Sequence, residues 1–169
     1  MRDSSFEAIL HDLGDLTSGA TRSELDWLRD LYETYGSFDT DEARLAFDVR
    51  GLEALERALP VVIADIERTT RLEPDVKVFI EAVGKWDRIG VSYNGSYQTG
   101  LAWPIARAGV LVSLADYLRD YVVEDLWRAW PLCPHHRYAL YPEIHRSEPV
   151  WACRSHDHTV ARIGELQLP

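Results

Sequence analysis

Hydrophobic residues in the first third of the chain recur every three or four positions, which is the spacing of a helix with one buried face. Two short helices are predicted in this way, one over "SSFEAILHDLG" (residues 4–14) and one over "TRSELDWLRDLYETYG" (residues 21–36). Each stretch has a hydroxyl residue three positions before a glutamate, the pattern of a capping box, and each finishes with a glycine that can end a helix. Both stretches are therefore expected to be helical.

A third apolar stripe extends over residues 40–69, although Gly51 and Pro60 interrupt it. Proline removes a backbone donor inside a helix, so we expect two helical pieces rather than one straight helix. The stretch "RLAFDV" (residues 44–49) also alternates as a short strand does. Helix is favoured there, because "TDE" at residues 40–42 supplies a cap and acidic residues for a helix start.

The hydrophobic period changes to two after residue 75, which indicates strands. We expect one strand in "DVKVFIEAV" (residues 75–83), a second in "IGVSY" (residues 89–93) and a third in "SYQTG" (residues 96–100). The last two flank Asn94-Gly95, a strong hairpin signal because both residues tolerate the positive φ angles of a type I′ turn. These stretches predict a small antiparallel meander.

Aromatic and amide side chains gather between Tyr93 and Trp103, as they do at the rim of a ligand pocket. Aromatic cross-strand pairs are also what a stable meander needs, and this second interpretation is favoured. Helical periodicity returns over residues 103–129. Helices, then strands, then a helix indicate an α+β fold, with N-terminal helices, a small antiparallel meander, a long central helix and a C-terminal β subdomain.

The charge of the chain is unevenly placed. The formal net charge is −10; residues 1–129 contain 14 basic and 24 acidic residues, whereas residues 130–169 contain 4 of each. An acidic body without a basic run repels phosphate backbones, so we expect no nucleic-acid partner. The chain has no apolar run of membrane-spanning length and no signal-peptide pattern at its start, so we expect a cytoplasmic protein without a membrane partner.

Both cysteines and five of the six histidines lie in "WPLCPHHRYALYPEIHRSEPVWACRSHDH", residues 130–158. The stretch contains two C-x2-H pairs, and each pair can bind one side of a tetrahedral zinc ion. In a reducing compartment, metal binding or simple burial also explains two cysteines better than a disulfide framework does. The predicted zinc ligands are Cys133, His136, Cys153 and His156, with His135 and His158 as alternatives to the two histidines.

Residues 130–166 resemble a zinc ribbon, in which "CPHH" and "CRSH" take the place of the two cysteine knuckles. The segments "RYALYPEIHRSEPVWA" and "TVARIGEL" can supply three strands, so the resemblance implies a small sheet with the ligand pairs on turns at one end. We therefore expect two units, an acidic α+β body over residues 1–129 and a zinc-ribbon-like subdomain over residues 130–169, packed on that body.

A structural zinc site is favoured over a catalytic one, because four ligands are at hand and no H-E-x-x-H or deaminase pattern occurs. The favoured function is a small zinc-stabilised interaction or adaptor module whose partner is another protein. The alternative is a zinc-dependent hydrolase, in which one coordination position stays open and Glu143, Glu148, His145 or Asp157 assists.

The junction between the two units is short. Pro131 disfavours helical geometry at Trp130, so the central helix is expected to stop there. Trp127 and Trp130 are large and apolar, and the nearest surface that they can cover is that of the ribbon strands. We expect both tryptophans to fix the ribbon rigidly against the body, by contact with Val150, Trp151 and Ile163.

Overall fold

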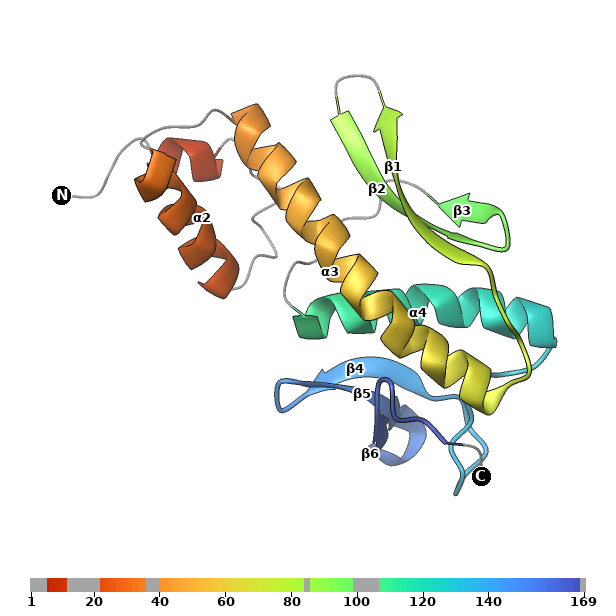
Figure 1. Ribbon diagram of the computed structural model, residues 1–169. Coiled ribbons are helices and arrows are strands. Elements are labelled where there is room, and N and C mark those ends of the chain that lie inside the picture. Colours follow the sequence, from red (N-terminus) through yellow and green to blue (C-terminus); the bar gives the residue numbers. More distant parts are fainter. Residues whose placement is uncertain (1–5, 12–21, 36–39, 84–85, 99–106, 168–169) are drawn as a thin grey trace.

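A computed structural model describes residues 6–11, 22–35, 40–83, 86–98 and 107–167 and confirms the predicted α+β fold, with helices and two antiparallel three-stranded sheets (Figure 1). Residues 6–11 are helical. The further elements are α2 (Arg22–Tyr35), α3 (Thr40–Thr69), β1 (Val76–Val83), β2 (Trp86–Tyr93), β3 (Ser96–Gln98), α4 (Arg107–Leu126), β4 (Tyr141–His145), β5 (Glu148–Cys153), the 3₁₀ turn η1 (Arg154–His156) and β6 (His158–Arg162).

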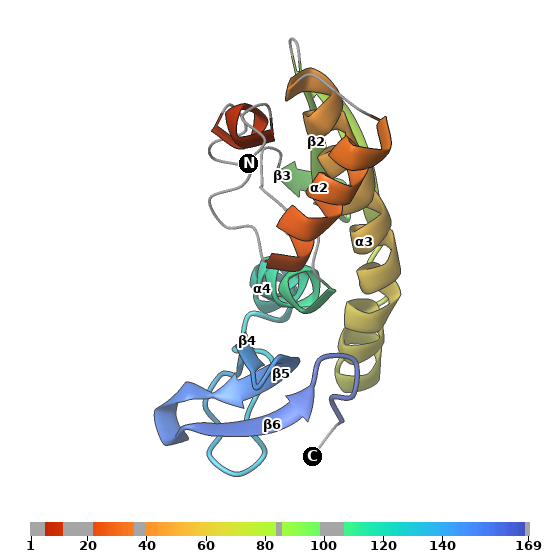
Figure 2. The same ribbon diagram turned by 90° about the vertical axis from the view of Figure 1, so that its left-hand side faces the viewer.

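Helix α3 connects the two sheets. It contacts β1 and β2 of the first sheet and crosses α4, and the second sheet lies beneath α4 and the C-terminal end of α3 (Figures 1 and 2). Gly51 explains how closely α3 approaches β2, since a Cβ atom at this buried position would lie 3.1 Å from Cδ1 of Ile89. None of the described helices is long and apolar enough to cross a membrane.

The expectation of two helical pieces between residues 40 and 69 is wrong, because α3 is one helix with Pro60 inside it, and the alternative strand at residues 44–49 is helical as well. Pro60 is exposed, whereas Ala58 and Val62 on the opposite face are buried. The carbonyl group that loses its intrahelical donor therefore lies on the side of the helix that faces water, where solvent can satisfy it.

The meander is confirmed. Strand β1 pairs antiparallel with β2, and β2 with β3, so that Tyr93 lies opposite Ser96 across the turn. The two turn residues have the expected positive φ angles, 50° for Asn94 and 83° for Gly95. The side chain of Asn94 also accepts a hydrogen bond of 2.9 Å from the backbone N–H of Asp75, which fixes the turn against the start of β1.

A buried tyrosine attaches the meander to α4. Tyr93 is 2 % exposed, and its hydroxyl group donates a hydrogen bond of 2.7 Å to Oδ2 of Asp125. Burial raises the pKa of Tyr93 above its usual value, and the neighbouring Asp125 carboxylate raises this pKa further. The suggested pocket between Tyr93 and Trp103 stays a prediction, since Trp103 lies outside the described residues.

We expect Tyr93→Phe to lower the free energy of unfolding by about 1 kcal/mol at neutral pH, because it removes one hydrogen bond to a carboxylate. A raised pKa in the folded state means that this stabilisation is present below pH 10.0, the ordinary tyrosine value, and is lost as the pH rises through the folded pKa. The difference in the free energy of unfolding between wild type and Tyr93→Phe should therefore become smaller as urea titrations are carried out at increasingly alkaline pH. Tyr97→Phe is the control, since Tyr97 is 62 % exposed; an equal loss in both variants would contradict the assignment.

The end of the central helix differs from the expectation. Helix α4 ends at Leu126, four residues before Trp130, and Trp127 follows it with a φ angle of 51°. This left-handed conformation turns the chain away from the helix and leaves Trp127 94 % exposed, so its expected packing on the ribbon strands is wrong. Trp130 does pack as expected, with its ring edge-to-face on Trp151 at a centroid distance of 5.6 Å.

The second sheet shares one hydrophobic core with α3 and α4. Its strands have the order β4-β5-β6, and all neighbours are antiparallel. Buried side chains of this C-terminal part belong to the same cluster as those of the two helices, and they include Trp130, Leu140, Trp151, Ile163 and Leu166. A sheet this small cannot bury a core of its own, so it depends on the helices for its apolar contacts.

Asp65 of α3 is the polar contact at this junction, and its side chain is fully buried. Its Oδ2 accepts hydrogen bonds from Nε1 of Trp151 at 2.8 Å and from the backbone N–H of Gly164 at 2.7 Å. Its Oδ1 accepts one from the backbone N–H of Leu166 at 2.8 Å, and Arg68 lies 3.2 Å away. Burial raises the pKa of Asp65, whereas these four donors act in the opposite direction.

We expect Asp65→Asn to lower the free energy of unfolding by about 3 kcal/mol, because the new amide group places N–H donors against the N–H donors of β5 and residues 164–166. Urea unfolding followed by tryptophan fluorescence measures this loss. Glu67→Gln removes a charge from an exposed position of the same helix and should cost about 0.5 kcal/mol or less. Equal costs for the two variants would contradict the role given to Asp65.

Candidate metal centre

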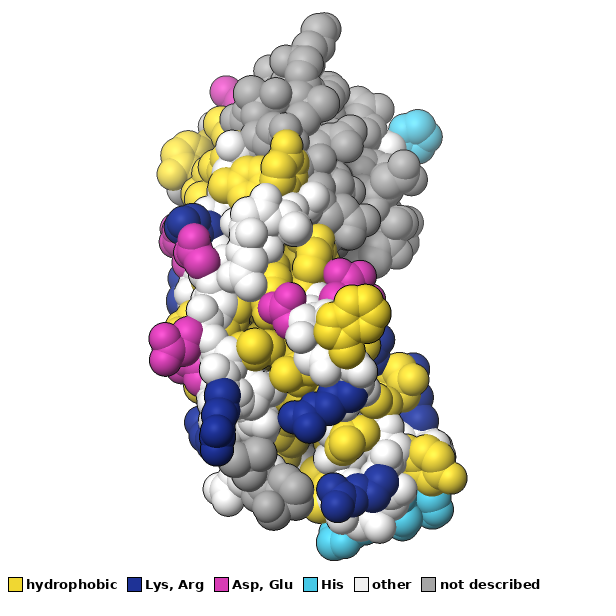
Figure 3. Space-filling model, turned by 90° about the vertical axis from the view of Figure 1, so that its right-hand side faces the viewer, with side chains coloured by type: hydrophobic (Ala, Val, Ile, Leu, Met, Phe, Trp, Pro, Cys, Tyr) yellow, Lys and Arg dark blue, Asp and Glu magenta, His cyan; other side chains and the backbone are white. Residues whose placement is uncertain are grey.

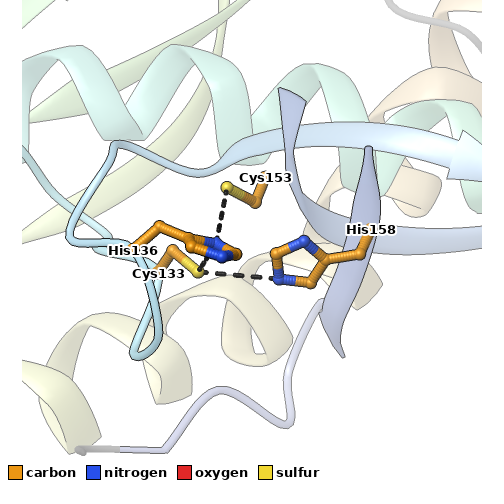
Figure 4. A group of neighbouring side chains, drawn as sticks. All are labelled: Cys133, His136, Cys153 and His158. Carbon is orange, nitrogen blue, oxygen red and sulfur yellow. Dashed lines mark hydrogen bonds between the residues drawn. The ribbon is translucent and has the colours of Figure 1, made fainter. Parts of the chain in front are cut away.

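The first ligand pair lies in a tight hairpin between α4 and β4. Leu132 and Ala139 form an isolated antiparallel bridge, and inside it the N–H of Cys133 donates to the carbonyl group of Tyr138 at 2.8 Å. The N–H of Arg137 returns to the carbonyl group of Cys133 at 2.9 Å. This closed turn, which begins with a proline after the cysteine, points the Cys133 and His136 side chains to the same side of the loop (Figure 4).

The second pair lies where β5 passes into β6. Cys153 is the last residue of β5, and η1 leads to Asp157, whose φ angle of 45° turns the chain back into β6. His158 begins β6 and lies directly opposite Cys153 in the strand register. The backbone N–H groups of Ser155 and His156, in the turn that follows Cys153, act to lower the pKa of its thiol. N–H groups of such a turn favour a thiolate.

Four side chains converge at this end of the sheet: Cys133, His136, Cys153 and His158 (Figure 4). Sγ of Cys133 lies 3.5 Å from Nδ1 of His136 and 3.6 Å from Nε2 of His158. Sγ of Cys153 lies 3.8 Å from the same Nδ1 atom of His136, and all four ligand atoms lie within 4.8 Å of one another. Both cysteines are buried and free, and both histidines are half-buried.

These distances match those of a tetrahedral metal site. With Zn–S bonds of about 2.3 Å and Zn–N bonds of about 2.0–2.1 Å, tetrahedral angles place sulfur and nitrogen ligands about 3.5 Å apart. The three sulfur–nitrogen distances of 3.5, 3.6 and 3.8 Å lie close to this value. The group can therefore hold a metal ion at its centre with only small adjustments of the side chains.

The surroundings of Cys153 and His136 favour the uncharged forms of these two side chains in the absence of a cation. Burial raises the pKa of the Cys153 thiol, the adjacent Cys133 raises it further, and the two backbone N–H groups lower it by less. Burial also lowers the pKa of His136, as do the neighbouring imidazoles. A divalent cation at the centre reverses the balance for the thiols, because it stabilises thiolates directly and coordinates neutral imidazole.

His156 and His135 lie outside this group of four. His156 is exposed, and its ring stacks on that of His136 with a centroid distance of 3.5 Å and an interplanar angle of 3°. His135 is also exposed, with its ring centroid 6.2 Å from that of His136. The structure thus brings together three of the four predicted ligands and the alternative His158. The signal for His158 is the β5–β6 hairpin, which places it opposite Cys153.

No known protein family, curated protein or solved structure matches the chain. The interpretation of the centre therefore depends on its own geometry. The group contains two thiols, two imidazoles and no carboxylate. Such a set suits a borderline-soft ion that accepts tetrahedral coordination.

The two histidines near Cys153 give a direct test of the ligand set. We expect His158→Ala to weaken zinc binding by more than about 100-fold, because losing a ligand should exceed the 10–100-fold effect of an outer-shell partner. His156→Ala removes a ring that stacks on His136 and Tyr138, and the zinc affinity of this variant should stay within about tenfold of wild type. Competition with a chromophoric chelator measures both affinities. A larger loss of zinc affinity in His156→Ala than in His158→Ala would show instead that His156, the histidine predicted from the C-x2-H spacing, is the ligand.

Proposed function

We propose that Cys133, His136, Cys153 and His158 bind one zinc ion, and that this ion is structural. The observation that carries the proposal is the convergence of two sulfur and two nitrogen atoms, all within 4.8 Å of one another, from a loop and two strands. The closed turn after Cys133 and the turn after Cys153, whose N–H groups lower the pKa of the Cys153 thiol, support a zinc-ribbon-like unit over residues 130–166. In this unit each knuckle contributes one cysteine and one histidine.

Two features favour a structural ion over a catalytic one. Four protein ligands complete a tetrahedron, whereas a catalytic zinc usually keeps a position for water. Of the residues that could assist a hydrolytic water, Glu143 lies 3.6 Å from Arg154 and Glu148 lies 3.6 Å from Arg162, so both carboxylates have a basic neighbour. Asp157 and His145 are exposed, but a closed tetrahedron would leave the zinc-dependent hydrolase no position for its water.

The ion would stabilise more than the small sheet. Structural zinc contributes roughly 10–16 kcal/mol of apparent binding free energy in small peptides. Cys133 and Cys153 belong to the core cluster that also contains buried residues of α3 and α4. Loss of the metal should therefore loosen the C-terminal half of α3 and α4 together with the sheet, and not the sheet alone.

We further propose that the protein is an interaction module that binds another protein. Large hydrophobic side chains are exposed on its surface, and Trp127, at 94 % exposure, is the most extreme. Exposed tryptophans of this kind are costly in water and are enriched at the centres of protein interfaces. The C-terminal unit would then serve to hold such side chains in fixed positions.

Elemental analysis and hydrogen exchange of the purified chain test the structural role. We expect one zinc per chain, and we expect Cys153→Ser to lose the metal and the amide protection of β4–β6 and α4. The cluster of Phe6, Leu28 and Tyr32 is separate from the main core, so α2 should keep its protection. His145→Ala is the control, because this exposed histidine lies at the opposite end of the β4–β5 hairpin. A metal-free wild-type chain with full protection would refute the proposal.

A further inference from the structure

A cavity of about 480 Å³ opens beside the metal centre, between the end of α3, the loop that follows α4, strand β6 and the C-terminal residues. Trp130, Cys133 and Leu166 contribute to its walls and are buried, whereas Arg128 and Arg137 at its margin are exposed. The cavity therefore combines an apolar interior with a basic rim. Because Cys133 forms part of its wall, the zinc knuckle also shapes this cavity.

The two arginines of the rim have no ion pair within the part of the chain that the structure describes. Glu165 is the acidic residue among those that line the cavity. A basic rim is notable in a chain with a formal net charge of −10. It supplies a local site for carboxylates, which planar guanidinium groups bind in a bidentate manner.

Two residues of this region adopt a conformation that their side chains disfavour. Trp127 has a φ angle of 51° and Arg137 one of 61°, in the left-handed region that favours glycine. Trp127 follows the last residue of α4, a position where glycine is the usual choice. Neither side chain is buried, so packing into the core does not compensate for the cost. At Trp127 the left-handed conformation leaves the side chain exposed at the end of α4.

Figure 3 shows the face at which α4 ends. Basic and hydrophobic side chains lie next to one another on its lower part, above the histidines at the bottom. The exposed hydrophobic residues in this part of the chain include Trp127 and Leu132, next in sequence to Arg128 and to Cys133. Arginine and tryptophan are the residues most enriched among those that dominate binding energy at protein interfaces.

We propose that this surface, formed by Trp127, Arg128, Leu132, Arg137 and the cavity between them, docks a short acidic segment of a partner protein. Carboxylates of the segment pair with Arg128 and Arg137, and one apolar side chain enters the cavity. Trp127 packs on the segment from outside the rim. The inference rests on the proposed function and extends it, because it identifies the contact surface and the chemistry of the partner.

Charge decides between a short acidic segment and a nucleic acid. A nucleic acid is a long polyanion that would extend from the rim across the acidic body, whose residues 1–129 contain 24 acidic and 14 basic residues. The Debye length at physiological ionic strength is about 8 Å. A short segment can remain within this distance of the two arginines, so the repulsion between its carboxylates and the more distant acidic residues of the body is largely screened. The observations therefore favour a peptide.

A random peptide display library, selected on the immobilised full chain as purified, tests the proposal. We expect the enriched peptides to combine Asp or Glu with a large apolar residue. For a synthesised enriched peptide, Arg128→Glu or Arg137→Glu should weaken binding about tenfold or more. Arg146→Glu is the matched control, because Arg146 is an exposed arginine in the β4–β5 turn, outside the cavity lining, and should leave binding unchanged.

Trp127→Gly separates a binding role from a structural one. Glycine suits the left-handed conformation at this position, so the variant should melt at the same temperature as wild type or higher, while its affinity for the peptide falls about tenfold or more. Enrichment of peptides without acidic residues, or equal binding by the wild type and the Arg128→Glu and Arg137→Glu variants, would overturn the proposal. So would tighter binding of single-stranded RNA than of any enriched peptide.

Two further readouts distinguish the possible failures. Selection that succeeds only on a chain ending at Gln167 would show that the last residues of this chain occupy the cavity, which also overturns the proposal. Zinc content is measured on the same preparation used for selection. If acidic peptides bind through Arg128 and Arg137 but the chain contains no zinc, the docking surface is supported and the proposed zinc ion is contradicted. If the chain contains zinc but selects no such peptides, the zinc ion is supported and the docking surface is contradicted.

Discussion

The carboxylate of Asp65 holds the long helix α3 and the C-terminal sheet together, and the arrangement of the C-terminal half depends on it. It is fully buried, and it accepts hydrogen bonds from the Trp151 indole and from the backbone N–H groups of Gly164 and Leu166. A buried carboxylate is costly unless donors surround it, so a shift of the helix relative to the sheet would leave Asp65 unpaired at a high cost. Trp130 adds a second link, because its Nε1 donates to Oγ1 of Thr69 at 2.9 Å.

Strand β5 transmits this fixed position to the metal centre. Trp151 is bound to Asp65, and Cys153, two residues further along the same strand, contributes a sulfur atom to the group of four. Residues two apart in a strand point to the same face. The side chain that binds α3 and the side chain that contributes to the metal centre therefore lie on the same side of the sheet. The ion would bind the far end of that face to the loop of Cys133 and His136. Helix, sheet and loop then form a single body, and the basic rim at Arg128 and Arg137 acquires a defined geometry.

Local signals predicted the regular elements well. Capping boxes and periodicity located α2, and Asn94-Gly95 located the hairpin between β2 and β3, because these signals depend on neighbouring residues alone. Two errors arose where a local rule met its tertiary surroundings. Pro60 is tolerated because it lies on the exposed face of α3, and Trp127 is exposed because the chain leaves α4 in a left-handed conformation. The residues next to Pro60 do not show which face of α3 is exposed, and the residues next to Trp127 do not show in which direction the chain leaves α4.

The candidate site was predictable in its composition but less so in its exact membership. Two cysteines and several histidines within one segment indicated a metal site, yet equal C-x2-H spacings favoured His156, whereas the strand register places His158 opposite Cys153. Asp65 gave no signal at all, since its three donors in the C-terminal part are 86 to 101 residues away in the sequence. A buried acid in an amphipathic helix is recognised only when its distant donors are known.

X-ray absorption at the zinc edge tests the central claim most directly, because it reports the atoms around the ion in the intact protein in solution. We expect a first shell of two sulfur atoms at about 2.3 Å and two imidazole nitrogen atoms at about 2.0–2.1 Å, without a water oxygen. A first shell with an oxygen ligand in place of one imidazole or thiolate, or a purified protein that contains no zinc, would contradict a closed structural site.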